Sequence, residues 1–181
     1  MSTSLVDKIV TIASALDDAA LPHAFGGALA LAWCTRRARG TIDIDVNIFV
    51  DADQAAIALA ALPAPVRRDD RDLARAVADG QVRLWWDTTP VDVFLDSTDF
   101  HREAAHRTRR EPFGGTEVAF LGCSDLAVFK AFFDRSKDWV DLEEMLAAGS
   151  LDIDRVLGVL SRYLGATDHR VDRLRAMLPR T

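Results

Sequence analysis

The sequence is poor in the features that would anchor a protein in a membrane or cross-link it. Its cysteines, Cys34 and Cys123, are too few and too far apart in sequence for a disulfide framework or a zinc site. No segment approaches the run of about 18 apolar residues that a membrane span requires. No basic segment at the N-terminus leads into an apolar run. We therefore expect a soluble, untargeted protein of the reducing cytoplasm, without a membrane partner.

Positive charge is also scarce. The 181 residues include 28 acidic and 22 basic side chains, a formal net charge of −6. This balance argues against a protein that coats nucleic acid non-specifically, although it leaves room for a local basic groove. Among the basic residues only Lys8, Lys130 and Lys137 are lysines. Because arginine is the usual cation in this chain, a lysine on an apolar helix is of particular interest.

The periodicity of the apolar residues predicts two lobes. An α/β lobe is expected over residues 1–122, and a lobe made only of helices over residues 123–181. Within the first lobe, residues 82–87, 88–90 and 91–96 are typical of strand, turn and strand. The first helix of the second lobe is expected to have Ser124 as its N-cap.

The most informative segment is the predicted strand over residues 42–50. Every second residue from Ile42 to Val50 is a branched aliphatic, which indicates a strand packed on a core. The intervening Asp43, Asp45 and Asn47 would project from the opposite face. Same-face residues lie about 6.5–7 Å apart along a strand, so two carboxylates could converge on a divalent cation. The alternative is a solvated strand face, and Asn47 is interpreted as structural.

A third carboxylate could come from the strand at residues 91–96. Asp92 is the preferred candidate because it lies within that strand, on the face of Phe94 and Asp96. Asp87 and Asp96 compete for the role, but each closes its strand, where a carboxylate can simply be solvated.

Three further features accompany the carboxylates. Gly26-Gly27 lies at a strand-to-helix junction, where backbone N–H groups can approach phosphate oxygens. Arg39-Gly40-Thr41 leads directly into the aspartate strand, and Arg39 could contact phosphate or form a bracing ion pair. Lys130 lies on a helix that also presents Leu126, Phe129 and Phe133 to a core, so its ammonium needs an anionic partner.

This ordered set resembles the nucleotidyltransferase superfamily over roughly residues 20–145. The elements of the resemblance are the Gly-Gly turn, a buried helix, the R-x-T-x-D-I-D sequence of residues 39–45 and a later strand aspartate. Residues 130–141, with the pattern K…R-x-K-D-x-x-D, look like the same region of the AbiEii/AbiGii-type enzymes, known as toxins of type IV toxin–antitoxin pairs. One departure is the 15-residue gap between Gly27 and Asp43. The resemblance implies a nucleotidyltransferase-like α+β fold, a mixed β-sheet flanked by helices and followed by a helical lobe.

The resemblance also implies roles for individual residues. Asp43 and Asp45 would bind Mg²⁺, or alternatively Mn²⁺. Asp92 would complete a second metal site or accept the proton of the attacking hydroxyl. Lys130 would be catalytic and contact the β/γ-phosphates. The remaining nucleotide-binding positions implied by the resemblance are Gly26, Gly27, Arg39, Thr41, Asp138 and Asp141. Asp138 and Asp141 share a helix face, and carboxylates are favoured in a first helical turn regardless of function.

The implied reaction is the Mg²⁺-dependent transfer of a nucleoside monophosphate from an NTP to an acceptor hydroxyl. The resemblance favours RNA or another macromolecule as acceptor, with the chain as a toxin and an antitoxin protein as its partner. The basic stretch at residues 101–110 could guide RNA, or could be a solvated helix face. A second possibility is a small acceptor such as an aminoglycoside. A third is a nucleotide-binding module of the same fold that does no chemistry.

Overall fold

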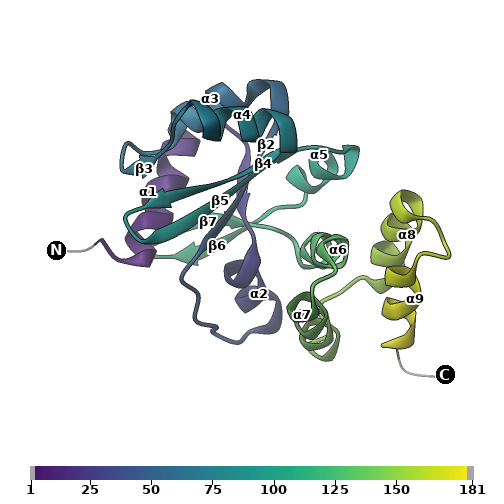
Figure 1. Ribbon diagram of the computed structural model, residues 1–181. Coiled ribbons are helices and arrows are strands. Elements are labelled where there is room, and N and C mark those ends of the chain that lie inside the picture. The colour runs from purple at the N-terminus through teal and green to yellow at the C-terminus, as the bar shows by residue number, and fades with distance from the viewer. Residues whose placement is uncertain (1–2, 179–181) are drawn as a thin grey trace. The chain divides into compact units, whose positions relative to one another are not determined.

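The computed structural model describes residues 3–178, which divide into two compact units (Figure 1). The first unit contains the described residues up to Leu29 together with Arg39–Leu121. The second unit contains Ala30–Ala38 and the described residues from Gly122 onward. No helix in this part of the chain is both long enough and apolar enough to cross a membrane.

One mixed β-sheet forms the centre of the first unit. Its seven strands are β1 (His23–Phe25), β2 (Ile44–Asp51), β3 (Val66–Arg67), β4 (Gln81–Trp86), β5 (Thr89–Asp96), β6 (Arg109–Phe113) and β7 (Thr116–Phe120). Their order across the sheet is β3-β4-β5-β2-β1-β7-β6. Strand β2 runs parallel to β5, and β1 runs parallel to β7, whereas the other neighbours are antiparallel. The predicted α+β class with a mixed sheet is confirmed.

Helices pack on this sheet through regular apolar faces. The helices of the first unit are α1 (Leu5–Asp18), α3 (Ala55–Ala61), which follows a 3₁₀ turn at Ala52–Gln54, α4 (Asp70–Asp79) and α5 (Asp99–Ala105). Helices α1, α3 and α4 gather on one side of the sheet (Figure 1). Ile9, Ile12 and Leu16 at helical spacing on α1 are fully buried. Lys8 lies beside them, and its ammonium donates to the Trp86 carbonyl at 3.1 Å. This buried lysine therefore joins α1 to the end of β4.

The aspartate strand starts later than its alternation predicts. Ile44, Val46 and Ile48 are fully buried, but Ile42 is 80 % exposed because β2 begins only at Ile44. Asp43 consequently lies in the segment that enters the strand.

The turn between β4 and β5 also differs from the prediction of residues 88–90. The turn residues are Asp87 and Thr88, since Trp86 pairs with Thr89. Asp87 has a φ of 53°, a conformation that aspartate tolerates better than most residues.

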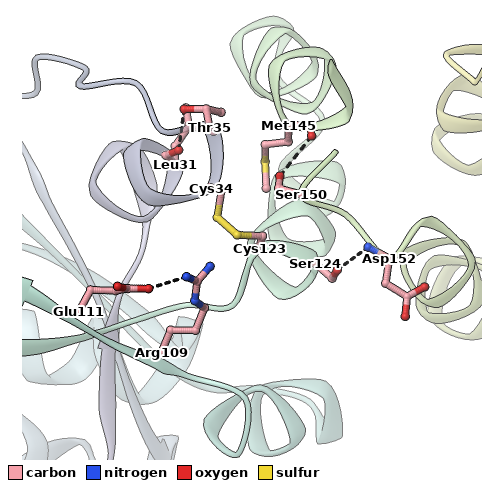
Figure 2. Close-up of a disulfide and its surroundings, with 10 residues drawn as sticks. All are labelled: Leu31, Cys34, Thr35, Arg109, Glu111, Cys123, Ser124, Met145, Ser150 and Asp152. Atoms are coloured by element: carbon pink, nitrogen blue, oxygen red, sulfur yellow. Dashed lines mark hydrogen bonds and ion pairs between the residues drawn. A yellow bond between two sulfur atoms is a disulfide. The ribbon is translucent and has the colours of Figure 1, made fainter. Parts of the chain in front are cut away.

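The second unit is helical. Its helices are the end of α2 (Gly27–Thr35), α6 (Cys123–Phe133), α7 (Ser136–Ala147), α8 (Ile153–Leu164) and α9 (His169–Ala176). The predicted N-cap of α6 is wrong: Gly122 is the N-cap, and Ser124 is the second helical residue. The Ser124 hydroxyl instead accepts a hydrogen bond from the Asp152 N–H at 2.9 Å, at the start of α8 (Figure 2).

A disulfide joins Cys34 to Cys123, although two cysteines so far apart in sequence were not expected to form a disulfide framework (Figure 2). Their Cα atoms are 5.5 Å apart although 89 positions separate them in sequence. Sequence distance misled here because the end of α2 belongs to the same unit as α6. A reducing compartment was expected from the small number and wide separation of the cysteines, and the disulfide removes that argument.

Candidate functional site

The pairing of β2 with β5 brings two of the predicted carboxylates together. Asp45 is the register partner of Asp92 in this parallel pair, so both side chains lie on one face of the sheet. Neighbouring strands are about 4.8 Å apart, which places the two carboxyl groups side by side. Both residues are partly exposed. Like charges at this spacing repel, so the pair favours a cation nearby.

The Gly-Gly turn closes directly on Asp45. The Gly26 N–H donates to the Asp45 carbonyl at 2.9 Å and so continues the pairing of β1 with β2. Gly27 has a φ of 53°, and a Cβ added there would lie 1.8 Å from the Asp45 Oδ2 atom. Any side chain at this position would therefore displace the Asp45 carboxylate. The Asp45 carboxylate thus lies beside Gly27, the first residue of α2. The N-terminal end of a helix favours negative charge.

Asp43 lies one step before the strand and interacts with Thr41. The Thr41 hydroxyl is 2.5 Å from the Asp43 Oδ1 atom, and it is 3.3 Å from the Asp43 N–H. Thr41 therefore orients a predicted metal ligand. Arg39, two residues earlier, is exposed.

Asp92 is held by an arginine that our sequence analysis did not single out. Arg83 lies opposite Asp92 in the β4–β5 hairpin and binds both carboxylate oxygens, with Nε–Oδ1 at 2.7 Å and Nη2–Oδ2 at 2.6 Å. Hydrogen bonding and charge from Asp92 raise the pKa of Arg83, and the charges of Asp43 and Asp45 raise it further. Three carboxylates thus act on one guanidinium. The outward position of Arg83 on an alternating strand, combined with the correct turn, would have revealed this pairing.

The competitors for the third carboxylate lie elsewhere in the first unit. Asp87 is in the β4–β5 turn, with a carboxylate oxygen 3.5 Å from the Lys8 ammonium. Asp96 pairs in register with Asp51 near the far end of the same strands. Burial, together with the charge of Asp51, raises the pKa of Asp96 to about 6. Only Asp92 of the three lies beside Asp45.

The acidic group suits a metal that the nucleotide helps to bind. Within residues 3–178, no three His, Cys, Asp or Glu side chains are arranged to enclose a metal ion. Mg²⁺ does not require such a cage, because about one or two carboxylates usually hold it together with water and substrate phosphates. Asp43 and Asp45 offer hard oxygen donors, and the missing Cβ of Gly27 lets the Asp45 carboxylate lie against the start of α2. These residues fit Mg²⁺ or Mn²⁺.

The predicted nucleotide-binding residues of the second unit form a buried ion-pair network. The Lys130 ammonium lies 2.6 Å from the Asp141 Oδ2 atom and 3.7 Å from the Asp138 Oδ1 atom. Arg135 also binds both oxygens of Asp138, at 2.6 and 3.2 Å. Lys130, Asp138 and Asp141 are each at most 7 % exposed. The anionic partner expected for Lys130 is therefore Asp141 in the next helix, and the nucleotide-binding roles of these residues stay predictions.

The basic stretch at residues 101–110 carries much of its charge in ion pairs. Arg102 binds Asp51 and Asp99, Arg109 binds Glu111, and Arg110 is within 4 Å of two further carboxylates. Burial lowers the pKa of His101 to about 4, so that ring is neutral at pH 7. The ion pairs leave this stretch with little net positive potential for a phosphate backbone.

A shallow pocket lies around Trp85 at the β3 edge of the sheet. Trp85 is 44 % exposed, whereas its neighbour Trp86 is 5 % exposed. Trp85 follows Arg83 by two residues on β4 and pairs in register with Arg67 of β3. The pocket measures about 600 Å³ and is lined by Arg67, Arg68, Asp69, Asp72, Trp85, Asp87 and Thr88. It combines an open indole ring with three carboxylates and two arginines.

Comparisons with known proteins identify the fold. No protein-family model and no curated protein matches the sequence. The solution structure of the antibiotic-resistance factor ANT(2'')-Ia matches 97 % of this chain and 91 % of that chain, with a TM-score of 0.56 and 16 % identity. The crystal structure of ANT(2'')-Ia in complex with adenylyl-2''-tobramycin matches 96 % of both chains, with a TM-score of 0.57 and 18 % identity.

A third match is an antigenic nucleotidyltransferase-like protein from Paracoccidioides brasiliensis, at a TM-score of 0.49 and 14 % identity over 91 % of both chains. The two ANT(2'')-Ia matches, at TM-scores of 0.56 and 0.57, show that the chain shares their fold, in agreement with the predicted nucleotidyltransferase-like fold. Membership of the AbiEii/AbiGii type stays a prediction.

Proposed function

We propose that this protein is a nucleotidyltransferase that transfers a nucleoside monophosphate from an NTP to a hydroxyl group of a small cationic acceptor. The observation that carries the proposal is the register of Asp45 with Asp92, together with Gly27 closing on the Asp45 carboxylate. In the reaction, the acceptor oxygen bonds to the α-phosphorus. The bond from the α-phosphorus to the bridging oxygen breaks, and pyrophosphate leaves.

Each residue of the group has a distinct part in this proposal. Asp43 and Asp45 hold the Mg²⁺ that would neutralise charge developing on the phosphates. Thr41 orients the Asp43 carboxylate through its hydroxyl. Asp92 accepts the proton of the attacking hydroxyl, as a carboxylate can within hydrogen-bond reach. Gly27 begins α2, whose positive N-terminal end favours phosphate oxygens.

A small cationic acceptor is supported by three observations. Trp85 lies on the same sheet face as Asp92, and the pocket around it has three carboxylates and two arginines in its lining. An open indole face binds organic cations well. The arginines at 102, 109 and 110 are in ion pairs, which weakens the case for an RNA acceptor. ANT(2'')-Ia, whose fold this chain shares, was crystallised with adenylyl-2''-tobramycin. The RNA acceptor and the antitoxin partner remain predictions from the sequence resemblance.

The direct test incubates the protein with Mg²⁺ and each NTP in turn, labelled at the α-phosphorus. Two acceptor pools are supplied separately, a panel of aminoglycosides and total RNA. We expect label on an aminoglycoside and none on RNA. Label on RNA alone would reject the small acceptor but retain the nucleotidyltransferase.

The matched control is Asp45→Asn, which keeps the size of the side chain and removes its charge. We expect this variant to bind NTP weakly and to transfer no label. If calorimetry shows NTP binding that is indifferent to Mg²⁺ and to Asp45→Asn, and no label moves, the chain is a binding module instead.

A further inference from the structure

Asp45, Asp92 and Arg83 form one continuous row across three neighbouring strands. Asp45 pairs with Asp92 between β2 and β5, and Asp92 pairs with Arg83 between β5 and β4. Because paired residues project from the same face, the guanidinium is the next side chain in line after the two carboxylates. Asp43 immediately precedes Ile44, the first residue of β2, and so lies two positions before Asp45 in the chain. The row is therefore fixed by backbone pairing.

Arg83 carries a positive charge that acts on all three carboxylates. Each carboxylate raises the pKa of Arg83, with Asp92 contributing most. Arg83 thus supplies part of the compensation that a bound cation would otherwise provide.

Exposure differs across the Arg83–Asp92 pair. The Asp92 side chain is 16 % exposed, so its charge needs a partner. The Arg83 side chain is 55 % exposed, so it can move into solvent at low cost. The guanidinium also uses an acceptor position on each oxygen of Asp92. A cation that approaches Asp92 must share these oxygens with Arg83 or displace it.

We propose that Arg83 is a resident counter-cation of the Asp43–Asp45–Asp92 group, bound to it through Asp92, and competes with the divalent cation that this group binds. The inference rests on the proposed function for the identity of the group as a metal site. It adds a positioning residue that neither the sequence motifs nor the fold comparisons single out. Arg83 keeps Asp92 in place without metal and lowers the affinity of the group for metal.

The test is the affinity for Mn²⁺ alone, measured from the paramagnetic resonance signal of free Mn²⁺. Arg83→Gln removes the charge, and we expect it to bind Mn²⁺ about tenfold more tightly than the wild type, because one competing charge is gone. Arg83→Lys keeps the charge but loses the planar fork, so its affinity should lie between the two. Arg83→Gln should also melt at a lower temperature without Mn²⁺ and recover more than the wild type when Mn²⁺ is added.

Arg102→Gln is the matched control. It also removes one positive charge from an arginine bound to aspartates, but Arg102 contacts Asp51 and Asp99 instead. We expect its Mn²⁺ affinity to stay within about twofold of the wild type, since exposed charges beyond the Debye length are screened. Equal affinities for Arg83→Gln and Arg102→Gln would overturn the proposal.

Asp45→Asn separates the two possible failures. If it abolishes Mn²⁺ binding while Arg83→Gln changes nothing, the metal site stands and only the role of Arg83 is rejected. If Asp45→Asn binds Mn²⁺ as tightly as the wild type, the cation does not bind to this group. The role of Arg83 and the metal part of the proposed function then fail together.

Discussion

The two units carry similar charged side chains in opposite surroundings. In the first unit, Asp43, Asp45 and Asp92 are partly exposed and share the guanidinium of Arg83. In the second unit, Lys130, Asp138 and Asp141 are buried and satisfy one another. Removing one member of a buried ion-pair network leaves an uncompensated charge, whereas a partly exposed group of carboxylates can bind a cation. We therefore propose a functional role for the first group and expect the second to be structural.

The largest effect should come from breaking the buried network. Lys130→Met leaves Asp141 buried without its 2.6 Å partner. We expect a loss of about 3–5 kcal/mol in the free energy of unfolding, because an unpaired buried charge is costly. Urea unfolding followed by circular dichroism measures this loss. Lys137→Met in α7, the helix that carries Asp141, is the control, since Lys137 is exposed and should change little. A Lys130→Met variant as stable as the wild type would contradict the structural role.

A smaller effect is expected from the disulfide of the second unit. Cys34→Ser opens a cross-link between residues 89 positions apart. We expect a loss of about 2–4 kcal/mol in unfolding free energy, as is typical for removal of a native disulfide. Dithiothreitol should destabilise the wild type by a similar amount in thermal melts. It should leave the Cys34→Ser/Cys123→Ser variant unchanged, and equal sensitivity of both proteins would refute the cross-link.

Asp96 extends the comparison to a buried carboxylate of the first unit. Its folded pKa of about 6 lies above the ordinary value of 3.8. The folded protein therefore binds the proton more tightly, and its stability should fall as the pH rises from about 4 through 6. Asp96→Asn should remove this fall and be more stable than the wild type at pH 7 by about 1–3 kcal/mol. Unfolding at pH 4, 6 and 7 checks it, and parallel pH curves for both proteins would contradict it.

The smallest effect is expected at the pocket beside the acidic row. Trp85→Ala removes the open indole ring but no charge. We expect the KM for an aminoglycoside acceptor to rise several-fold, worth about 1 kcal/mol, with kcat nearly unchanged. Steady-state kinetics measure it, with the KM for NTP as internal control. A fall in kcat at constant acceptor KM would place Trp85 outside the acceptor site.

Much of the first unit could be predicted because its signals are local. Alternation identified the strand that carries Asp45, and the glycine pair marked the junction that closes on it. The β4–β5 register was missed because the turn was predicted at residues 88–90, which starts one residue too late and is one residue too long. With the turn at Asp87-Thr88, Arg83 falls opposite Asp92. A hairpin register depends entirely on its turn, so this error hid the partner of Asp92.

The second unit was harder to interpret because its contacts join distant segments. Cys34 and Cys123 meet only because the end of α2 belongs with the C-terminal helices. No periodicity in the sequence reveals that grouping. For Lys130, the need for an anionic partner was predictable from its apolar helix. Which anion it meets depends on how α6 packs against α7, and a single sequence contains no direct signal for that.

The partly exposed carboxylates of the first unit are the proposed functional group, and Asp45→Asn tests this role most directly. The measurement is Mg²⁺-dependent release of pyrophosphate from NTP in the presence of an aminoglycoside, with the folded state confirmed by thermal melting. We expect Asp45→Asn to melt within a few degrees of the wild type and to lose at least about 10²-fold in rate. A folded Asp45→Asn protein that releases pyrophosphate at the wild-type rate would contradict the claim.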